Sequence, residues 1–223
     1  MAGVALIVIA KAPVPGRVKT RLCPPLGFEQ AAALAEAALF DTLAVASRVR
    51  RSGGGRRVLA FDGPGGDRFA PAGGEVVAQR GLGLAERLDA AFADVGGPAL
   101  LVGMDTPQLT AELLLDGIAA LSRPGVDAVL GPARDGGYWS IGLARAVAGV
   151  FDGVPMSRRS TCAAQRRRLA ELGLSVHEQP VLRDVDTFAD AVAVARCAPR
   201  SRFALALGGV LDAEPRRAVG ARA

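Results

Sequence analysis

Short apolar runs alternate with longer segments of helical periodicity along most of the chain. The apolar runs predict strands at Val4–Ala10, Arg57–Asp62, Glu75–Gln79, Ala99–Gly103, Asp127–Leu130, Tyr138–Leu143 and Leu174–Glu178. Apolar residues spaced as on one helix face predict helices at Phe28–Arg51, Leu84–Val95, Thr110–Leu121, Ser157–Leu172 and Thr187–Cys197. Strands that alternate with helices predict βαβ units, and therefore an α/β fold around a mostly parallel sheet.

Segments rich in glycine and proline separate these elements. Lys11–Gly27 contains four prolines and two glycines, and it is predicted to have no regular structure. Ligands of open α/β sheets bind beyond the carboxyl ends of the strands. We therefore expect the loops that follow Ala10, Gly103 and Leu130 to converge on one site.

The pattern indicates a single domain over residues 1–198. The segment 199–223 is rich in Arg, Pro and Ala, and we expect it to be a loosely packed tail. Hydrophobic residues make up 50% of the 223-residue chain and charged residues 22%, a balance that suits a globular core rather than a disordered chain.

Composition narrows the class of protein further. Three widely spaced cysteines form no CxxC pair, which favours a reducing, cytoplasmic compartment and argues against a cysteine zinc site. The apolar N-terminus has no basic leader and meets Lys11 and Pro13 early, so it predicts a buried strand rather than a signal peptide or membrane span. The net charge of +5 suits a phosphorylated ligand without requiring a nucleic acid.

The loop after the first strand carries the strongest chemical signal. Its sequence KAPVPGRVKTRL presents four cations, and Lys11 and Lys19 are the only lysines of the chain. Backbone N–H groups and cations of such a loop can bind a di- or triphosphate. The predicted phosphate-binding residues are Lys11, Pro15, Gly16, Arg17, Lys19, Thr20 and Arg21. The alternative is a solvated basic loop.

Acidic residues follow two of the predicted strands. Asp105 ends a buried strand and can hold Mg²⁺ or Mn²⁺ against phosphates, or it can simply cap the next helix. Asp184 and Asp186 would share one face of an extended segment, so both could reach the same cation, whereas Asp186 or Thr187 could instead cap a helix. Lys19 and Asp105 are the expected catalytic residues.

A glycine loop forms the third candidate region. Asp135, Gly136, Gly137 and Tyr138 are expected to bind substrate, because glycines allow close backbone approach. Tyr138 and Trp139 would face opposite sides of a strand, so only one could stack on a ligand. His177 has no Ser or Cys partner in the sequence and is expected to be structural, which argues against a Ser-His-Asp hydrolase.

The motifs K-A-P-x-P-G-R-V-K-T-R-L, G-x-D-x-P around Asp105, G-P-x-x-D-G-G-Y and D-V-D-T-x-x-D resemble the bacterial rSAM/selenodomain-associated transferase family. They are more distantly similar to 2-phospholactate and molybdenum-cofactor guanylyltransferases. This resemblance implies a GT-A, nucleotide-diphospho-sugar transferase-like fold, a three-layer sandwich. Gly103 stands where many GT-A enzymes have the first acid of Asp-x-Asp, and Met156 replaces an aromatic residue.

The residues and the resemblance together indicate a metal-dependent transferase with a nucleotide-activated donor and a small-molecule acceptor. Glycosyl transfer from a nucleotide-sugar is the first expectation, and nucleotidyl transfer from an NTP to a phosphorylated acceptor is the second. A non-catalytic nucleotide- or nucleic-acid-binding protein is the alternative of another class, although no RNA-binding motif is present. We expect no nucleic-acid or membrane partner, and the oligomeric state stays open.

Overall fold

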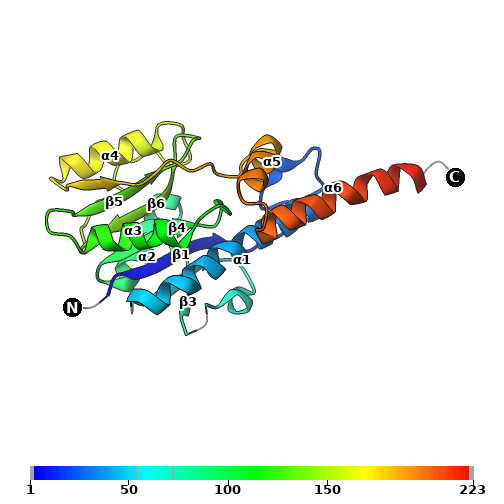
Figure 1. Cartoon of the computed structure of the whole chain (residues 1–223). Helices are drawn as coiled ribbons and strands as arrows, with labels where there is room; N and C mark the ends of the chain where they lie inside the picture. The colour runs from blue at the N-terminus through cyan, green and yellow to red at the C-terminus, as the bar shows by residue number, and fades with distance from the viewer. Residues whose placement is uncertain (1–2, 54, 72, 221–223) are drawn as a thin grey trace.

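The computed structural model describes residues 3–53, 55–71 and 73–220. Seven strands form one sheet in the order β3-β2-β1-β4-β6-β5-β7 (Figure 1). The strands are β1 (Ala5–Lys11), β2 (Arg57–Asp62), β3 (Glu75–Ala78), β4 (Ala99–Gly103), β5 (Ala128–Pro132), β6 (Tyr138–Leu143) and β7 (Val176–Glu178). β1 pairs in parallel with β2 and β4, whereas β6 runs antiparallel to both β4 and β5. The predicted α/β fold with a mostly parallel sheet is confirmed.

Helices cover both faces of the sheet. They are α1 (Phe28–Gly53), α2 (Leu84–Val95), α3 (Ala111–Leu121), α4 (Thr161–Glu171), α5 (Phe188–Cys197) and α6 (Arg202–Gly220). Leu6, Val8 and Ala10 of β1 pack with α1 and α3, while Ala5 and Ile7 pack with α2 and α4 on the other face. Both faces of β1 are therefore buried, which explains why its sequence is continuously apolar.

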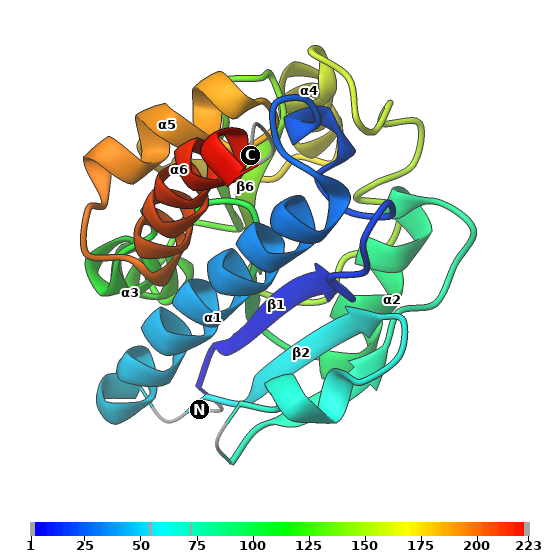
Figure 2. The same cartoon turned by 90° about the vertical axis from the view of Figure 1, so that its right-hand side faces the viewer.

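The segment after residue 199 differs from the expected loose tail. It forms α6, which lies against α1 and α5 and then extends past the body of the protein (Figures 1 and 2). Phe203 and Leu207 are buried in a cluster with α1 and α5. Asp41 of α1 accepts hydrogen bonds from the backbone N–H groups of Arg202 and Phe203, at 3.0 and 2.9 Å, and so caps the helix. The expectation of loose packing is therefore wrong for the first half of α6.

Two smaller corrections concern loops beside the sheet. The predicted helix from Ser157 begins instead at Thr161, because Ser157 has a φ of 57°, which a helix cannot accommodate. Thr20–Leu22 forms one turn of 3-10 helix within the segment expected to be irregular. None of the helices in the described part of the chain combines the length and apolar character that a membrane span needs.

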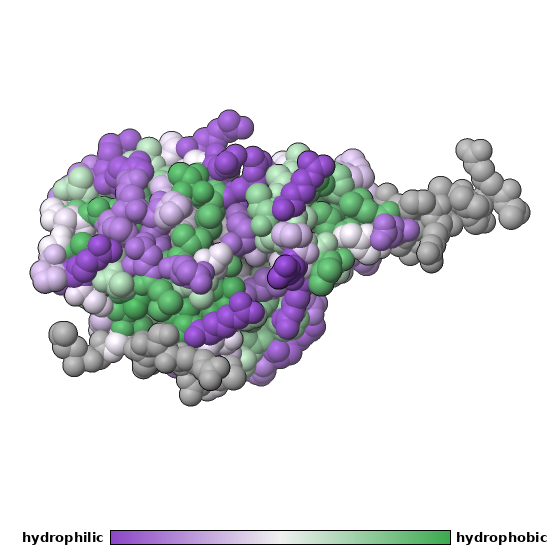
Figure 3. Space-filling view, in the orientation of Figure 1, coloured by the Kyte–Doolittle hydropathy of each residue, from purple (hydrophilic) through white to green (hydrophobic). Residues whose placement is uncertain are grey.

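Surface hydropathy follows this layering. Figure 3 shows purple, hydrophilic side chains distributed over the helices and loops, with green, apolar areas between them. The large apolar side chains that remain exposed include Leu82 just before α2, Leu84 at its start, and Leu205 in α6.

Candidate functional site

A cleft of about 1090 Å³ opens at the carboxyl ends of the parallel strands. Its walls come from the loops after β1, β3, β4 and β5, and from the segments that precede α4 and α5. The expected convergence of the loops after Ala10, Gly103 and Leu130 is confirmed, because residues of all three line this one cleft. The antiparallel strand β6 begins at the same end and contributes Tyr138 and Trp139.

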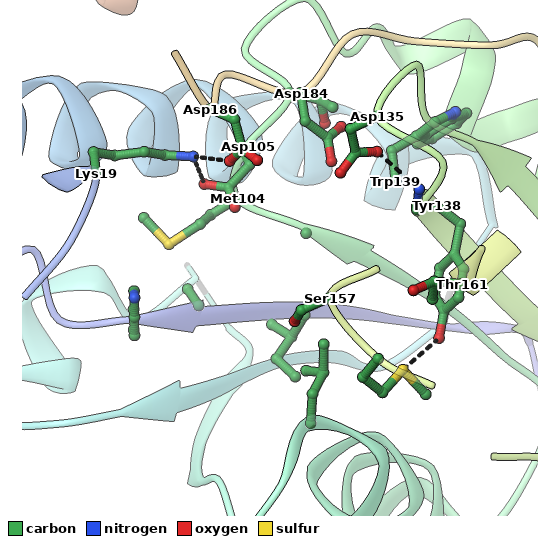
Figure 4. Close-up of a pocket in the computed structure, with 18 of the residues that line it drawn as sticks. Lys19, Met104, Asp105, Asp135, Tyr138, Trp139, Ser157, Thr161, Asp184 and Asp186 are labelled. Carbon is green, nitrogen blue, oxygen red and sulfur yellow. Dashed lines mark hydrogen bonds and ion pairs between the residues drawn. The ribbon is translucent and has the colours of Figure 1, made fainter. Parts of the chain in front are cut away.

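Lys19 connects three segments at the cleft. Its backbone is left-handed, with φ 48° and ψ 32°, and its side chain is only 9% exposed. The ammonium forms an ion pair with Asp105 at 2.7 Å, donates to the carbonyl oxygen of Val185 and lies 4.0 Å from Asp186 (Figure 4). Much of its charge is therefore compensated by protein groups, and Lys19 holds the loops after β1 and β4 to the segment before α5.

The other residues of the basic loop divide into two groups. Lys11, Thr20 and Arg21 line the cleft with Lys19, whereas Pro15, Gly16 and Arg17 are not among the residues that line it. Gly16 has a φ of 74°, and Arg17 N–H donates to the carbonyl of Val14 at 3.0 Å, so this part forms a tight turn. The turn presents the carbonyl oxygen of Arg17 to the Lys11 ammonium at 3.1 Å.

In the described part of the chain, five carboxylates line the cleft, and one of them, Asp190, is paired with Arg183 at 2.7 Å. The other four are Asp105, Asp135, Asp184 and Asp186, and Figure 4 shows Asp184 and Asp135 beside each other, farther from Lys19 than Asp105 is. Burial, together with the negative charges of Asp105 and Asp135, raises the pKa of Asp184 to about 8. The buried Oδ1 of Asp184 has no hydrogen-bond partner among the described residues.

These carboxylates can be tested as ligands of the expected metal. Carboxylate oxygens are the donors that Mg²⁺ and Mn²⁺ prefer, and a divalent cation would satisfy the unpaired Asp184 oxygen. Within the described ranges, however, no three Asp, Glu, His or Cys side chains are grouped closely enough to hold a metal. Asp105 and Asp186 are drawn toward Lys19 instead. The carboxylate oxygens therefore suit the metal chemically, but they are too few to surround it completely. Mg²⁺ often binds through one or two carboxylates together with substrate phosphates and water.

Neither Asp105 nor Asp186 caps a helix, contrary to the alternative that the sequence left open. Thr187, not Asp186, caps α5, with a reciprocal hydrogen-bond pair to Asp190. The cap of α3 is Thr110, so Asp105 does not cap that helix. Neither is therefore used as a helix cap; both line the cleft, where Asp105 pairs with Lys19 and Asp186 pairs with Arg21 at 3.2 Å.

The glycine loop is braced against the segment before α4. Asp135 Oδ1 accepts from Gly137 N–H at 2.8 Å, and Gly136 has a φ of 92°. A Cβ at Gly136 would overlap the carbonyl oxygen of Arg159, and Cys162 N–H donates to the Gly136 carbonyl at 2.8 Å. Gly136 is needed for this close backbone packing, whereas Asp135, Gly137 and Tyr138 line the cleft.

Tyr138 and Trp139 lie on opposite faces of β6, as their adjacency requires. Trp139 is 2% exposed in the α1–α3 core, and its indole N–H donates to the Pro180 carbonyl at 3.0 Å. The Tyr138 hydroxyl contacts Met156 Sδ at 3.8 Å and Gln165 Oε1 at 3.4 Å, and burial raises its pKa. Both rings are anchored largely by the protein.

His177 pairs with Asp116 at 3.0 Å and is not among the cleft residues, consistent with a structural role.

Several cleft residues were not singled out from the sequence. Gln79 directly follows β3, where its amide donates to the carbonyls of Ala10 and Ala60 at 2.7 and 3.0 Å. Its position after a parallel strand was a signal that could have identified it. Arg134 and Arg159 also line the cleft, the former beside Asp135 in the glycine loop.

The fold is shared with solved nucleotide-using enzymes. A protein from Desulfovibrio desulfuricans G20, provisionally described as a nucleotide-diphospho-sugar transferase, is 28% identical, with a TM-score of 0.83; the match covers 97% of this chain and 98% of that one. CMP:2-keto-3-deoxy-manno-octonic acid synthetase complexed with CTP has a TM-score of 0.55 at 15% identity, with coverage of 89% and 99%. A cytidylyltransferase from Leptospira borgpetersenii serovar Hardjo-bovis has a TM-score of 0.55 at 13% identity, with coverage of 96% of both chains.

The first of these structures shares the predicted nucleotide-diphospho-sugar transferase fold, and the two cytidyl enzymes add evidence about the fold alone. No curated protein matches the chain. The narrower resemblance to rSAM/selenodomain-associated transferases and guanylyltransferases stays a prediction. Residues 42–158, slightly more than half of the chain, match the family described as uncharacterized proteins conserved in bacteria (DUF2064), and the chain belongs to that family.

Proposed function

We propose that this protein is a metal-dependent transferase that uses a nucleotide-activated donor, with glycosyl transfer from a nucleotide-sugar as its reaction. The observation that carries the proposal is the cleft itself. It brings a basic loop and several carboxylates together, and one of these, Asp184, has a buried oxygen without a partner. The similarity to a protein described as a nucleotide-diphospho-sugar transferase supports the choice of donor.

Each group of residues has a defined part in this proposal. Lys11, Thr20 and Arg21 bind the donor diphosphate, because they line the cleft and carry donors or positive charge. Asp105, Asp184 and Asp186 are the candidate ligands of Mg²⁺ or Mn²⁺, which when bound supplies positive charge against the leaving diphosphate. Asp135, Gly137 and Tyr138 contact the sugar or the acceptor. Positioning of donor and acceptor provides much of the remaining rate enhancement.

Lys19 takes a different part from the one suggested by its sequence. Because its ammonium is paired with Asp105, we propose that it acts first as a positioning residue that orients this carboxylate. A contact between Lys19 and donor phosphate would require that ion pair to be shared or broken. Lys11, which is exposed, is thus the better probe of phosphate binding.

Nucleotidyl transfer is the second candidate. The basic loop contributes Lys11, Lys19 and Arg21 to one wall of the cleft, and this concentration of cations suits a triphosphate. In that reaction a phosphorylated acceptor attacks the α-phosphate and pyrophosphate leaves. Release of pyrophosphate therefore separates the two candidates.

The first experiment is a thermal-shift screen of UDP- and GDP-sugars and of GTP, CTP, UTP and ATP, with and without Mg²⁺ or Mn²⁺. A ligand at a hundredfold excess over its Kd stabilises the native state by about 2.7 kcal/mol. We compare wild type with Lys11→Ala and use Arg17→Ala as the matched control, because Arg17 belongs to the same loop but does not line the cleft.

The proposal expects a metal-dependent shift that Lys11→Ala reduces and Arg17→Ala leaves intact. A preference for nucleotide-sugars supports glycosyl transfer, whereas a preference for a triphosphate together with pyrophosphate release favours nucleotidyl transfer. Absence of a shift with every nucleotide would contradict both candidates.

A further inference from the structure

Three arginines of the cleft have no compensating partner. The side chains of Arg134, Arg158 and Arg159 line it, are exposed, and make no ion pair or side-chain hydrogen bond in the part of the chain that the structure describes. The other cleft arginines are paired: Arg21 with Asp186 at 3.2 Å, Arg87 with Asp62 at 2.6 Å and Arg183 with Asp190 at 2.7 Å. An ion pair uses part of a guanidinium's five donors, whereas the three unpaired guanidinium groups keep all of theirs for an anion.

The backbone that carries these arginines is held at several points. Arg134 N–H donates to the Leu182 carbonyl at 2.9 Å, and Arg158 N–H donates to Thr161 Oγ1 at 2.9 Å. The two segments abut where Gly136 packs on the backbone of Arg159. The three side chains therefore extend from neighbouring, anchored loops, which reduces the backbone entropy lost when they bind one ligand.

The three arginines lie on different segments from the basic loop. In Figure 4, Lys19 lies at one end of the labelled residues, and Tyr138 and Thr161 lie at the other, with the carboxylates between them. Arg134 adjoins Asp135 in the chain, and Arg158 and Arg159 lie between Ser157 and Thr161. The cleft thus has one group of cations on the basic loop with Lys19 and a second group on the segments that carry Asp135 and Thr161.

We propose that Arg134, Arg158 and Arg159 bind a phosphate monoester carried by the acceptor. This inference rests on the proposed function, since it takes the basic loop as the donor site. Three guanidinium groups match a dianionic phosphate with several acceptor oxygens, whereas one bidentate arginine suffices for a carboxylate. The acceptor is therefore a small phosphorylated molecule whose nucleophilic group points back toward the carboxylates.

The test measures binding by titration calorimetry of the full chain with three probes of related carbon skeleton: glycerol 3-phosphate, glycerate and glycerol. The test variant is Arg134→Gln/Arg158→Gln/Arg159→Gln. The matched control is Arg167→Gln/Arg196→Gln/Arg200→Gln, which removes the same charge from exposed arginines that do not line the cleft. Lys11→Ala reports whether a probe occupies the donor end instead.

We expect wild type to bind glycerol 3-phosphate at least about tenfold more tightly than glycerate, with glycerol weaker still. The cleft variant should lose about 30-fold or more in affinity for glycerol 3-phosphate, because several charge-assisted hydrogen bonds disappear. The control triple and Lys11→Ala should retain wild-type affinity within about twofold.

The inference would be overturned by no binding of glycerol 3-phosphate to wild type, by equal losses in the two triple variants, or by a loss confined to Lys11→Ala. Equal affinity for glycerate and glycerol 3-phosphate would contradict the assignment of a phosphate. A nucleotide thermal shift on the same proteins tests the proposed function separately. If no nucleotide binds but the arginines still bind phosphate, the donor assignment fails while the arginine site stands.

Discussion

Replacement of Asp184 by Asn tests the electrostatics of the cleft most directly. The pKa of this carboxyl is raised from an ordinary 3.8 to about 8, first by burial and then by the charges of Asp105 and Asp135. Because the folded state holds the proton more tightly than the unfolded state does, the contribution of Asp184 to stability falls as pH rises from about 4 to about 8 and is level outside that window. Asparagine has nearly the same shape and cannot ionise, so Asp184→Asn removes this fall.

The size of the effect follows from the same pKa values. One unit of pKa corresponds to about 1.4 kcal/mol. Between about pH 5 and about pH 8, wild type should therefore lose about 4 kcal/mol of stability relative to Asp184→Asn. In a chain of this size each kcal/mol moves the Tm by about 2–4 °C, so the two Tm curves should diverge by on the order of 10 °C.

The assay is thermal unfolding of both proteins across this pH range in the presence of a chelator. Asp67→Asn is the matched control, since Asp67 is exposed and is not among the cleft residues. Parallel Tm curves for wild type and Asp184→Asn would refute the buried, proton-binding state of Asp184. Added Mn²⁺ should restore part of the lost stability of wild type at high pH, and should do so less in Asp184→Asn, if this carboxylate is a metal ligand.

Three further substitutions test the scaffold, each followed by chemical denaturation. Lys19→Met should lower the free energy of unfolding by about 1–3 kcal/mol, because it removes a nearly buried charged donor. When it is combined with Asp105→Asn, the two losses of stability should be less than additive. Gly136→Ala should cost about 3 kcal/mol, since φ is 92° there and the new Cβ meets backbone, whereas Gly97→Ala meets no neighbour within 4 Å and should be tolerated. Phe203→Ala should cost about 3–5 kcal/mol if α6 is part of the core.

The controls for these substitutions are internal to the chain. Leu205→Ala alters a side chain that is 66% exposed in the same helix as Phe203, and it should change stability by less than about 0.5 kcal/mol. Equal effects of the two α6 substitutions would mean that the helix does not dock on α1 as described. Strict additivity of the Lys19 and Asp105 substitutions would argue against their ion pair.

The sequence was sufficient for most of the elements and for the general position of the site. Leu84–Val95, Ala99–Gly103 and Tyr138–Leu143 have the predicted bounds, because their periodicity ends at Gly or Pro residues or at a change of side-chain type. The strand-end rule located the cleft, since the carboxyl ends of parallel strands meet at one edge of a sheet whatever their order. These properties depend on local backbone preferences and on burial of one or both faces of an element.

Only the tertiary structure decided which side chains meet. Strand order and the antiparallel course of β6 arise from long-range pairing, and so does the contact of Lys19 with Asp105, 86 residues along the chain. The pKa of Asp184 is raised mainly by the loss of solvent and by the charges of Asp105 and Asp135, which are distant in the sequence. The docking of α6 likewise depends on Asp41 and on an apolar surface of α1. Spacing along the chain identifies candidate residues, but partners and desolvation set their charge state, and these exist only in the folded protein.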